Sequence, residues 1–252
     1  MHILITNDDG IYAPGLKALF DAFKAKYEVS VVAPAHEQSA TSHRITIRQP
    51  LRAHWTKVAD DMKGYAVNGT PADCVKLGLA QLISKKPDWV ISGINPGANT
   101  GFNVFYSGTA AAAREASALS IPAMAVSIAY CKPIDYSGTA QYVSYILEKI
   151  SQYVFSSGTF LNVNFPPVPV NQIKGIRLVR QATYHLYEHY VKRTDPQHMN
   201  YYWMSDEKMP VTNEQSTDFG ALENNYIAIT PLSIDTTDDC FFKHMENMGF
   251  GR

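Results

Sequence analysis

Short apolar runs alternate with amphipathic helical segments through the first two thirds of the chain. Residues 2–6 are apolar and end at the polar turn sequence of residues 7–10, which predicts a buried strand followed by a loop. Pro14 then begins a helical pattern, in which apolar residues recur at helical spacing as far as Tyr27. Residues 29–33 form a second apolar run. A strand, a helix and a strand in this order predict a βαβ unit whose two strands are parallel.

The same alternation continues as far as residue 165. Residues 70–73 read Thr-Pro-Ala-Asp, a capping box with proline at the first helical position, and predict a helix that ends near residue 86. Further strands are predicted at residues 89–91, 123–128 and 161–165, and further helices at residues 110–119 and 143–154. Strands that alternate with helices indicate an α/β fold with a Rossmann-like, doubly wound and mostly parallel sheet.

The pattern changes after residue 166. Helical periodicity fades, aromatic and polar residues mix, and β-like runs appear at residues 176–180 and 226–230. We therefore predict a Rossmann-like catalytic core over residues 1–166 and a β-rich extension over residues 167–252, packed on the core as one domain overall. The extension has the composition of an appendage, a flexible arm or an oligomerisation element.

Composition places the chain among globular proteins that need no disulfide or metal to fold. Of its 252 residues, 46% are hydrophobic and 18% are charged, which excludes a disordered or fibrous chain. A net charge of −1 disfavours a nucleic-acid duplex as the partner. Neither a long apolar run nor a basic, signal-like N-terminus is present, so no membrane association is expected. Three widely spaced cysteines indicate reduced thiols and a cytoplasmic protein.

Oxygen donors follow the predicted strands at the edge where open α/β sheets bind ligands. Asp8 and Asp9 come after the first strand, Ser39 after the second and Asn95 after the third. Carboxylate, amide and hydroxyl oxygens are ligands of Mg²⁺, Mn²⁺ or Ca²⁺ rather than of structural zinc. Alone, Asp-Asp-Gly is a common turn in which one carboxylate caps the next helix and the other is solvated. Its place at the end of a parallel strand, with Ser39 and Asn95 expected at the same edge, favours a metal site.

Two further segments have the composition of an anion site. Residues 92–101 combine three glycines with the amides of Asn95 and Asn99, which suits a tight loop around a ligand or a simple connector. This loop is neither a Walker loop nor a GxGxxG fingerprint, so the main sequence evidence for an NAD enzyme or a P-loop NTPase is missing. Ser107-Gly108-Thr109 precedes a helix and offers backbone N–H groups to a phosphate. Helix capping by one of the two hydroxyls explains that segment equally simply.

These motifs, in this order, resemble the SurE family of metal-dependent nucleotidases. The matching blocks are ILITNDDGI with APG at residues 3–15, VNGTPADCV at residues 67–75, and PD, SGIN and YSGTAAA with Arg114-Glu115 between residues 87 and 115. LNVNFP at residues 161–166, and Thr217-Asp218 with ITPL at residues 229–232, continue the match. The resemblance therefore covers nearly the whole chain.

The resemblance implies a 5′-nucleotidase that hydrolyses nucleoside 5′-monophosphates to nucleoside and phosphate, with one divalent cation per subunit, Mg²⁺ or Mn²⁺. Family members also act on short polyphosphate, and 3′-nucleotides are further candidate substrates. The family pattern assigns the metal ligands to Asp8, Asp9, Ser39 and Asn95, and phosphate binding to Asn99, Ser107, Gly108 and Thr109. Asp8, Asp9, Asn99 and Ser107 form the implied catalytic set. The C-terminal extension of the family exchanges between subunits, which implies a homodimer or homotetramer.

The sequence departs from the family pattern at two positions near the site. Ala40 stands where the family usually has glycine, and Asn103 stands where an aspartate is expected, so metal preference and affinity stay open. A non-catalytic nucleotide- or metal-sensing module on the same fold is the alternative function, because a fold does not guarantee turnover. A hydrolase of phosphoanhydrides is a third candidate. A nucleotidase releases phosphate from nucleoside monophosphates. A phosphoanhydride hydrolase releases it from polyphosphate or triphosphates but little from monophosphates, and a sensing module binds nucleotide without releasing phosphate.

Overall fold

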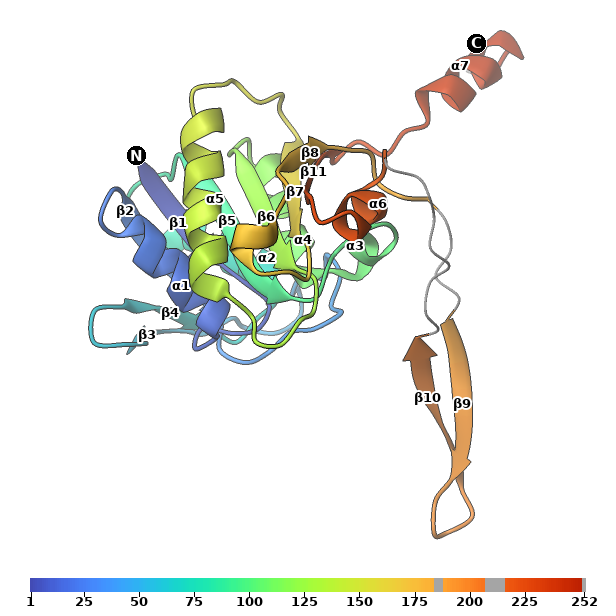
Figure 1. The fold of residues 1–252 in the computed structure, drawn as a ribbon, viewed down its shortest axis with the longest axis horizontal. Helices are drawn as coiled ribbons and strands as arrows, with labels where there is room; N and C mark the ends of the chain where they lie inside the picture. The colour runs from blue at the N-terminus through green and yellow to red at the C-terminus, as the bar shows by residue number, and fades with distance from the viewer. Residues whose placement is uncertain (184–187, 207–215, 251–252) are drawn as a thin grey trace.

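The protein is built on one large twisted sheet from which a hairpin and a helix project (Figure 1). The computed structural model describes residues 1–183, 188–206 and 216–250. The sheet has nine strands in the order β3-β4-β2-β1-β5-β6-β7-β11-β8. Their bounds are β1 His2–Thr6, β2 Glu28–Pro34, β3 Ala53–Lys57, β4 Lys63–Val67, β5 Trp89–Pro96, β6 Ala123–Ile128, β7 Thr159–Phe165, β8 Ile176–Leu178 and β11 Ile227–Ser233.

The strands confirm the predicted doubly wound, mostly parallel sheet. β1 pairs in parallel with β2 on one side and with β5 on the other, and β5, β6 and β7 continue the parallel order. β11 is antiparallel to β7, and the β3–β4 pair is antiparallel at the opposite edge. Because the chain runs from β1 to β2 on one side and later enters β5 on the other, the switch point of the sheet lies between β1 and β5. Ligands bind at such a point in open α/β sheets.

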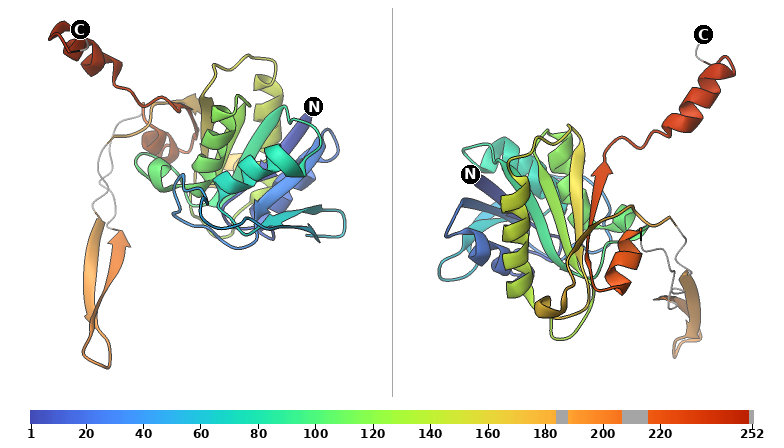
Figure 2. Two further views of the ribbon diagram at one scale, coloured as in Figure 1. Left: turned by 180° about the vertical axis from the view of Figure 1, so that it is seen from behind. Right: turned by 45° about the horizontal axis from the view of Figure 1, so that its top comes forward.

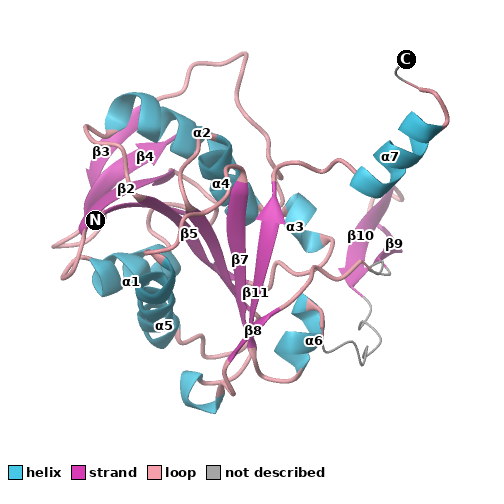
Figure 3. Ribbon diagram, turned by 90° about the horizontal axis from the view of Figure 1, so that it is seen from above, coloured by secondary structure: helices cyan, strands magenta, loops and turns pink. Residues whose placement is uncertain are grey.

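Two layers of helices cover the sheet (Figure 3). Helices α1 (Pro14–Phe23) and α5 (Tyr136–Ile150) lie on one face, and α2 (Pro71–Leu77) and α4 (Gly108–Ala118) lie on the other. Successive residues of β1 serve the two layers alternately, as the pleat of a strand requires. Ile3 and Ile5 pack in the cluster that contains α1 and α5, and Leu4 packs in the cluster with α2 and α4. Burying each such side chain contributes roughly 2 kcal/mol.

The capping box predicted for α2 is present, but the helix after it changes its geometry. Oγ1 of Thr70 accepts a hydrogen bond from the N–H of Asp73, and the Asp73 side chain accepts one from the N–H of Thr70. Regular α-helix ends at Leu77 and is followed by the π-helical segment Gly78–Leu82. The predicted extent, to near residue 86, was slightly too long.

Strand β5 runs beyond its predicted end. The sequence predicted a strand that stops at Ser92-Gly93, because glycine commonly marks a turn. In the structure the strand continues to Pro96, with a register shift between Ser92 and Asn95 against β6. Gly93 is required there by close packing, since a Cβ atom would lie 2.4 Å from the carbonyl oxygen of Val126. Asn95 consequently sits on the end of a strand rather than in a loop.

Some of the residues after 166 form strands of the sheet, and others project away from it. The predicted β-like runs correspond to β8 and β11, and the short 3₁₀ turn Val170–Gln172 and helix α6 (Asp218–Glu223) lie next to them. The hairpin of β9 (Glu188–Thr194) and β10 (Asn200–Asp206), called the arm below, stands away from the sheet, as does α7 (Asp239–Asn247), in each direction of view (Figure 2). The extension is therefore β-rich, as predicted, but it also holds two helices. No helix among the described residues is long and apolar enough to cross a membrane.

Candidate functional site

Asp8 is held at the switch point by the start of α4. It lies in the loop after β1 and is 6% exposed, and its Oδ1 accepts a hydrogen bond from Oγ1 of Thr109 at 2.5 Å. Gly108 lies directly against it, since a Cβ atom at that position would be 2.8 Å from Cβ of Asp8. Burial raises the pKa of Asp8, and the hydrogen bond from Thr109 opposes part of that rise. The structure thus joins a predicted metal ligand to two predicted phosphate-binding residues.

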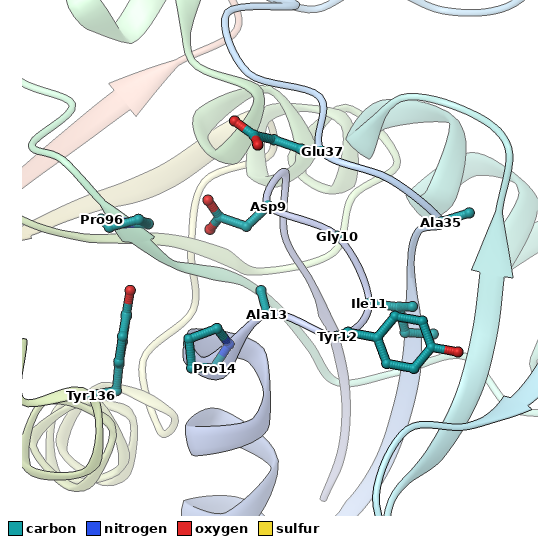
Figure 4. A pocket seen from close by; sticks show the side chains of 11 residues that line it. Asp9, Gly10, Ile11, Tyr12, Ala13, Pro14, Ala35, Glu37, Pro96 and Tyr136 are labelled. Carbon is teal, nitrogen blue, oxygen red and sulfur yellow. The ribbon is translucent and has the colours of Figure 1, made fainter.

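Asp9 faces a pocket of about 470 Å³ that it shares with Glu37 and Tyr136. Figure 4 shows the carboxylates of Asp9 and Glu37 near one another, with the Tyr136 side chain entering from α5. Oδ2 of Asp9 is buried and has no hydrogen-bond partner among the residues that the structure describes. Burial first, and then the charges of Asp8 and Glu37, raise the pKa of Asp9 to about 7. A buried, unpartnered carboxylate among other carboxylates calls for a positive charge.

Ser39 belongs to a loop that crosses from β2 to the loop after β1. The N–H of Gln38 donates to the carbonyl of Asp8 at 2.7 Å, which brings the two loops together. Ser39 is exposed, and its hydroxyl donates to Oε1 of Glu37 at 2.5 Å. The next residue, Ala40, has a φ of 52°, in the left-handed region that favours glycine. The departure from the family pattern at position 40 therefore falls where a side chain is unfavourable.

Asn95 stands at the end of β5, the strand that neighbours β1. It is half-buried, and its Nδ2 donates to the carbonyl of Gly97 at 2.6 Å. The amide oxygen is the atom that this bond leaves for a ligand. Because the carboxyl ends of β1 and β5 are adjacent, Asn95 and Asp8 occupy the same edge of the sheet.

Asn99 is the most firmly bonded residue of the loop between β5 and α4, called the site loop below (residues 97–107). Its N–H donates to Oδ1 of Asn164 at 2.8 Å, and its carbonyl accepts from Nδ2 of Asn162 at 2.8 Å. Its own Nδ2 donates to Oγ of Ser127 at 2.8 Å, so the amide oxygen is the side-chain atom not used by that bond. Two asparagines of the buried strand β7 therefore hold this loop in place. Polar residues at alternate positions of a buried strand are the sequence signal for such a role.

Ser107, Gly108 and Thr109 form the first turn of α4. Oγ of Ser107 accepts a hydrogen bond from the N–H of Ala110 at 2.9 Å, so the capping alternative holds for this hydroxyl. The first amides of a helix have no intrahelical acceptor, and the helix dipole favours an anion beside them. The short helix α3 (Asn103–Tyr106) leads directly into this turn. Capping and anion binding are therefore compatible at this position.

The donor set suits a hard divalent cation. Across residues 1–183, 188–206 and 216–250, no three His, Cys, Asp or Glu side chains converge as metal ligands, so a cation here needs amide and hydroxyl oxygens as well. Asp8 and Asp9 supply carboxylates, and Asn95 and Ser39 supply an amide and a hydroxyl oxygen at the same edge. The unpartnered Oδ2 of Asp9 is the structural observation that favours a cation over a solvated turn.

Glu37 and Tyr136 line the pocket but were not singled out as site residues by the sequence. Glu37 follows β2 among several polar residues, and nothing in its pattern separates it from Ser39. Tyr136 comes from the first turn of α5, more than a hundred residues after Asp9, and no motif marks it. Only the packing of α5 against α1 brings this side chain to the pocket.

Known proteins share this architecture over the whole chain. Residues 3–188 match the family described as Survival protein SurE. Two proteins named 5′-nucleotidase SurE are similar: that of Desulfatibacillum aliphaticivorans is 45% identical over 246 residues, with 98% of this chain and 97% of that protein covered. That of Natranaerobius thermophilus is 44% identical, with 99% of each covered. A crystal structure of the SurE protein from Aquifex aeolicus matches with a TM-score of 0.86 and 36% identity, covering 99% of this chain and 100% of that one. This chain belongs to the SurE family.

Proposed function

We propose that this protein is a divalent-metal-dependent 5′-nucleotidase, a phosphomonoesterase that releases phosphate from nucleoside 5′-monophosphates. The observation that carries the proposal is the unpartnered carboxylate of Asp9 in a pocket at the switch point, beside an Asp8 that is bonded to the first turn of α4. The proposed cation and anion positions would thereby be adjacent, as the hydrolysis of a phosphate ester requires. The names of the two bacterial relatives agree with it.

One divalent cation, Mg²⁺ or Mn²⁺, would be held by Asp8, Asp9, Ser39 and Asn95. When bound, it supplies the positive charge that neutralises phosphate oxygens and activates water. Asp9 is the key ligand of the set, because its buried oxygen has no other partner among the described residues. Ser39 would exchange its bond to Glu37 for a bond to the cation.

The phosphate would be held by Asn99, Ser107, Gly108 and Thr109. The amides at the start of α4 donate to its oxygens, and the absence of a side chain at Gly108 allows close approach. Nδ2 of Asn99 donates one hydrogen to Ser127, and its second N–H would donate to a phosphate oxygen. Since these groups bind phosphate without contacting the nucleoside, we extend the proposal to nucleoside 3′-monophosphates and to short polyphosphate.

The nucleoside would occupy the pocket at the N-terminal ends of α1 and α5. Tyr12 and Tyr136 line it together with Pro96, and Asp9 stands at its inner side (Figure 4). A volume of about 470 Å³ is within the range of small-ligand sites. Aromatic rings at the mouth offer faces on which a base can stack.

The extension would join two subunits, as a homodimer or within a homotetramer of a cytoplasmic enzyme. Tyr190 and Trp203 on the arm are 65% and 62% exposed, and Phe241 and Phe242 on α7 are 60% and 54% exposed. Apolar side chains presented this way mark an association surface. A second copy of the chain is the partner proposed for it.

Phosphate release from a panel of nucleoside 5′- and 3′-monophosphates tests the proposed function. The panel is run with EDTA and then with Mg²⁺, Mn²⁺ or Ca²⁺ restored, and polyphosphate and triphosphates are included. Release from 5′-monophosphates that stops with EDTA and returns with metal supports the nucleotidase. Release from anhydrides alone would indicate a phosphoanhydride hydrolase. A folded protein that binds nucleotide but releases no phosphate would be a sensing module.

A further inference from the structure

A buried carboxylate of the C-terminal extension is bonded to the site loop. Asp218 is fully buried, and its Oδ2 accepts a hydrogen bond from the N–H of Gly101 at 2.9 Å. The carbonyl oxygen of Gly101 accepts a hydrogen bond from Nε2 of Gln181 at 2.8 Å. The extension therefore bonds to both polar groups of the backbone at Gly101. Asn99 and Ser107, the proposed phosphate-binding residues, lie on either side of this point in the same loop.

The same carboxylate joins the two chain segments from which the arm emerges. Its Oδ1 accepts hydrogen bonds from the N–H of Ala182, before the arm, and of Phe219, after it, each at 2.9 Å. The N–H of Asp218 donates to the carbonyl of Arg180 at 2.8 Å, and the N–H of Arg180 donates to the carbonyl of Ser216 at 3.0 Å. Asp218 is therefore bonded both to the site loop and to the chain segments before and after the arm.

Gly101, whose N–H donates to Asp218, also packs closely against the extension at Ala182. Gly101 has a φ of 54°, and a Cβ atom there would lie 3.3 Å from the carbonyl oxygen of Ala182. Burial raises the pKa of Asp218, while the backbone N–H groups bonded to it oppose the rise. A buried carboxylate is tolerated only with such compensation. Loss of one acceptor oxygen leaves a buried N–H without a partner, which costs more than the bond itself contributes.

A displacement of Gly101 would pass along the loop to the start of α4. The N–H of Val104 donates to the carbonyl of Gly101 at 3.4 Å, and the N–H of Ser107 donates to that of Asn103 at 3.0 Å. Ser107 in turn caps α4. Asp8 and Asp9, in contrast, follow directly from the central strand β1, which pairs with β2 and β5, so these proposed metal ligands are positioned mainly by the sheet.

We propose that Asp218 is a positioning residue for the hydrolysis: its carboxylate keeps the site loop in the shape that presents Asn99 and Ser107 to the phosphate, and it is also bonded to the chain segments before and after the arm. The kinetic part of this proposal rests on the proposed nucleotidase function. The extension then contributes to turnover within its own subunit, in addition to its contact with a second subunit.

Asp218→Asn in the full-length protein tests the bond to the site loop selectively. The amide keeps the size of the carboxylate and one oxygen for the N–H groups of Ala182 and Phe219, while its NH₂ group faces the N–H of Gly101. We expect kcat for nucleoside 5′-monophosphates to fall by about tenfold or more. The Kd for Mn²⁺, measured by calorimetry without substrate, should change by less than about twofold. Gln181→Ala should lower kcat in the same direction and by less.

Val143→Ala serves as the control for a loss of stability alone. Val143 is fully buried in α5 and packs in the hydrophobic cluster on the α1 and α5 face of the sheet, whereas the proposed phosphate site lies at the start of α4 on the other face. Its truncation should lower the melting temperature and leave kcat unchanged at a temperature at which all variants are folded. A fall of kcat in Asp218→Asn no larger than that in Val143→Ala would overturn the positioning role.

Hydrogen exchange tests the same bond without relying on activity. Amides of the site loop should exchange faster in Asp218→Asn than in the unsubstituted protein, while amides of β1 should exchange at the same rate. If the unsubstituted protein releases no phosphate from any nucleotide, the proposed function fails and this measurement still decides whether Asp218 holds the loop. Unchanged exchange in the site loop would overturn the proposal.

Discussion

The sheet core and the arm differ in where their apolar side chains find contacts. All five residues of β1 are buried, and those on each face pack against helices of the same chain. On the arm, Tyr190 and Trp203 remain more than half exposed, and α7 has no buried residue. The central strand β1 buries its apolar residues within the chain, whereas the arm and α7 present theirs outward. The proposed chemistry belongs to the first region and the proposed association to the second.

The chain segments beside the arm are bonded to the core at a buried side chain. Asp218 follows the arm in sequence, yet its carboxylate is bonded to Gly101 of the site loop, 117 residues earlier. Substitutions in the core should therefore abolish phosphate release, and substitutions in the arm should weaken self-association. Substitutions at this junction should affect both. Single substitutions in each place separate these outcomes.

Asp9→Asn is expected to have the largest effect on activity. It removes the charge of the one site carboxylate with a buried, unpartnered oxygen among the described residues. Phosphate release at saturating Mg²⁺ or Mn²⁺ should fall about a thousandfold, because charge at the reacting phosphate would no longer be balanced. The circular dichroism spectrum and the oligomeric mass should not change. Activity within about tenfold of the unsubstituted protein would contradict the assignment of Asp9.

Gly108→Ala should lower kcat by about a hundredfold, since misplacement of a reacting group by about 1 Å can cost that much. A methyl group at this position would lie 2.8 Å from Cβ of Asp8 and 3.1 Å from its Oδ2, so Asp8 must move. Gly78→Ala is the matched control: it is also helical, and its methyl group would make ordinary contact with Val32 at 3.4 Å. Equal loss of activity in the two variants would show that Gly108 has no special relation to Asp8.

Trp203→Ala should weaken association about tenfold or more without affecting the folded subunit. An exposed aromatic residue that a partner covers typically contributes about 2 kcal/mol to binding. Tyr153→Ala is the control, because Tyr153 is similarly exposed, at 66%, but lies after α5 on the core. Sedimentation equilibrium measures both. A Kd for self-association that is equal in the two variants would remove the arm from the interface.

Glu115→Gln should reduce the loss of stability in acid by about 1 kcal/mol. Burial by itself raises the pKa of Glu115, but hydrogen bonds from His43 and Lys76, each at 2.8 Å, outweigh it and the pKa lies below its ordinary value. The carboxylate therefore stabilises the fold above the unfolded-state pKa, and this contribution is lost as the pH falls through the lower folded-state pKa. Urea unfolding from pH 7 to pH 3 measures the difference. Parallel curves for the two proteins would contradict it.

Local patterns predicted the central elements of the fold closely. The apolar run at residues 123–128 corresponds to β6 with the same bounds, and the capping box at residues 70–73 starts α2 as predicted. Such patterns are reliable because the pleat of a strand and the turn of a helix repeat over a few residues. The polar residues after the first strand, Asp8 and Asp9, could be assigned to the sheet edge for the same reason.

Several features depended on contacts that no local pattern records. Gly93 suggested the end of a strand, but the approach of the Val126 carbonyl requires glycine within it. Helix α6 has only six residues, too few for periodicity to show. Tyr136 reached the pocket through the packing of α5. Sequence spacing carries no information about such approaches.

The sequence by itself determined the central strands β1, β2, β5, β6 and β7 with most of the helices between them, the change of character after residue 166 and the oxygen donors at the strand ends, because each follows from the spacing of neighbouring residues. The tertiary structure alone decided that Oδ2 of Asp9 is buried without a partner, and that Asp218 rather than another acidic residue is bonded to Gly101. Hydrogen bonds and desolvation act over a few ångströms of space, and residues far apart in the chain become neighbours only when the sheet and its helices pack.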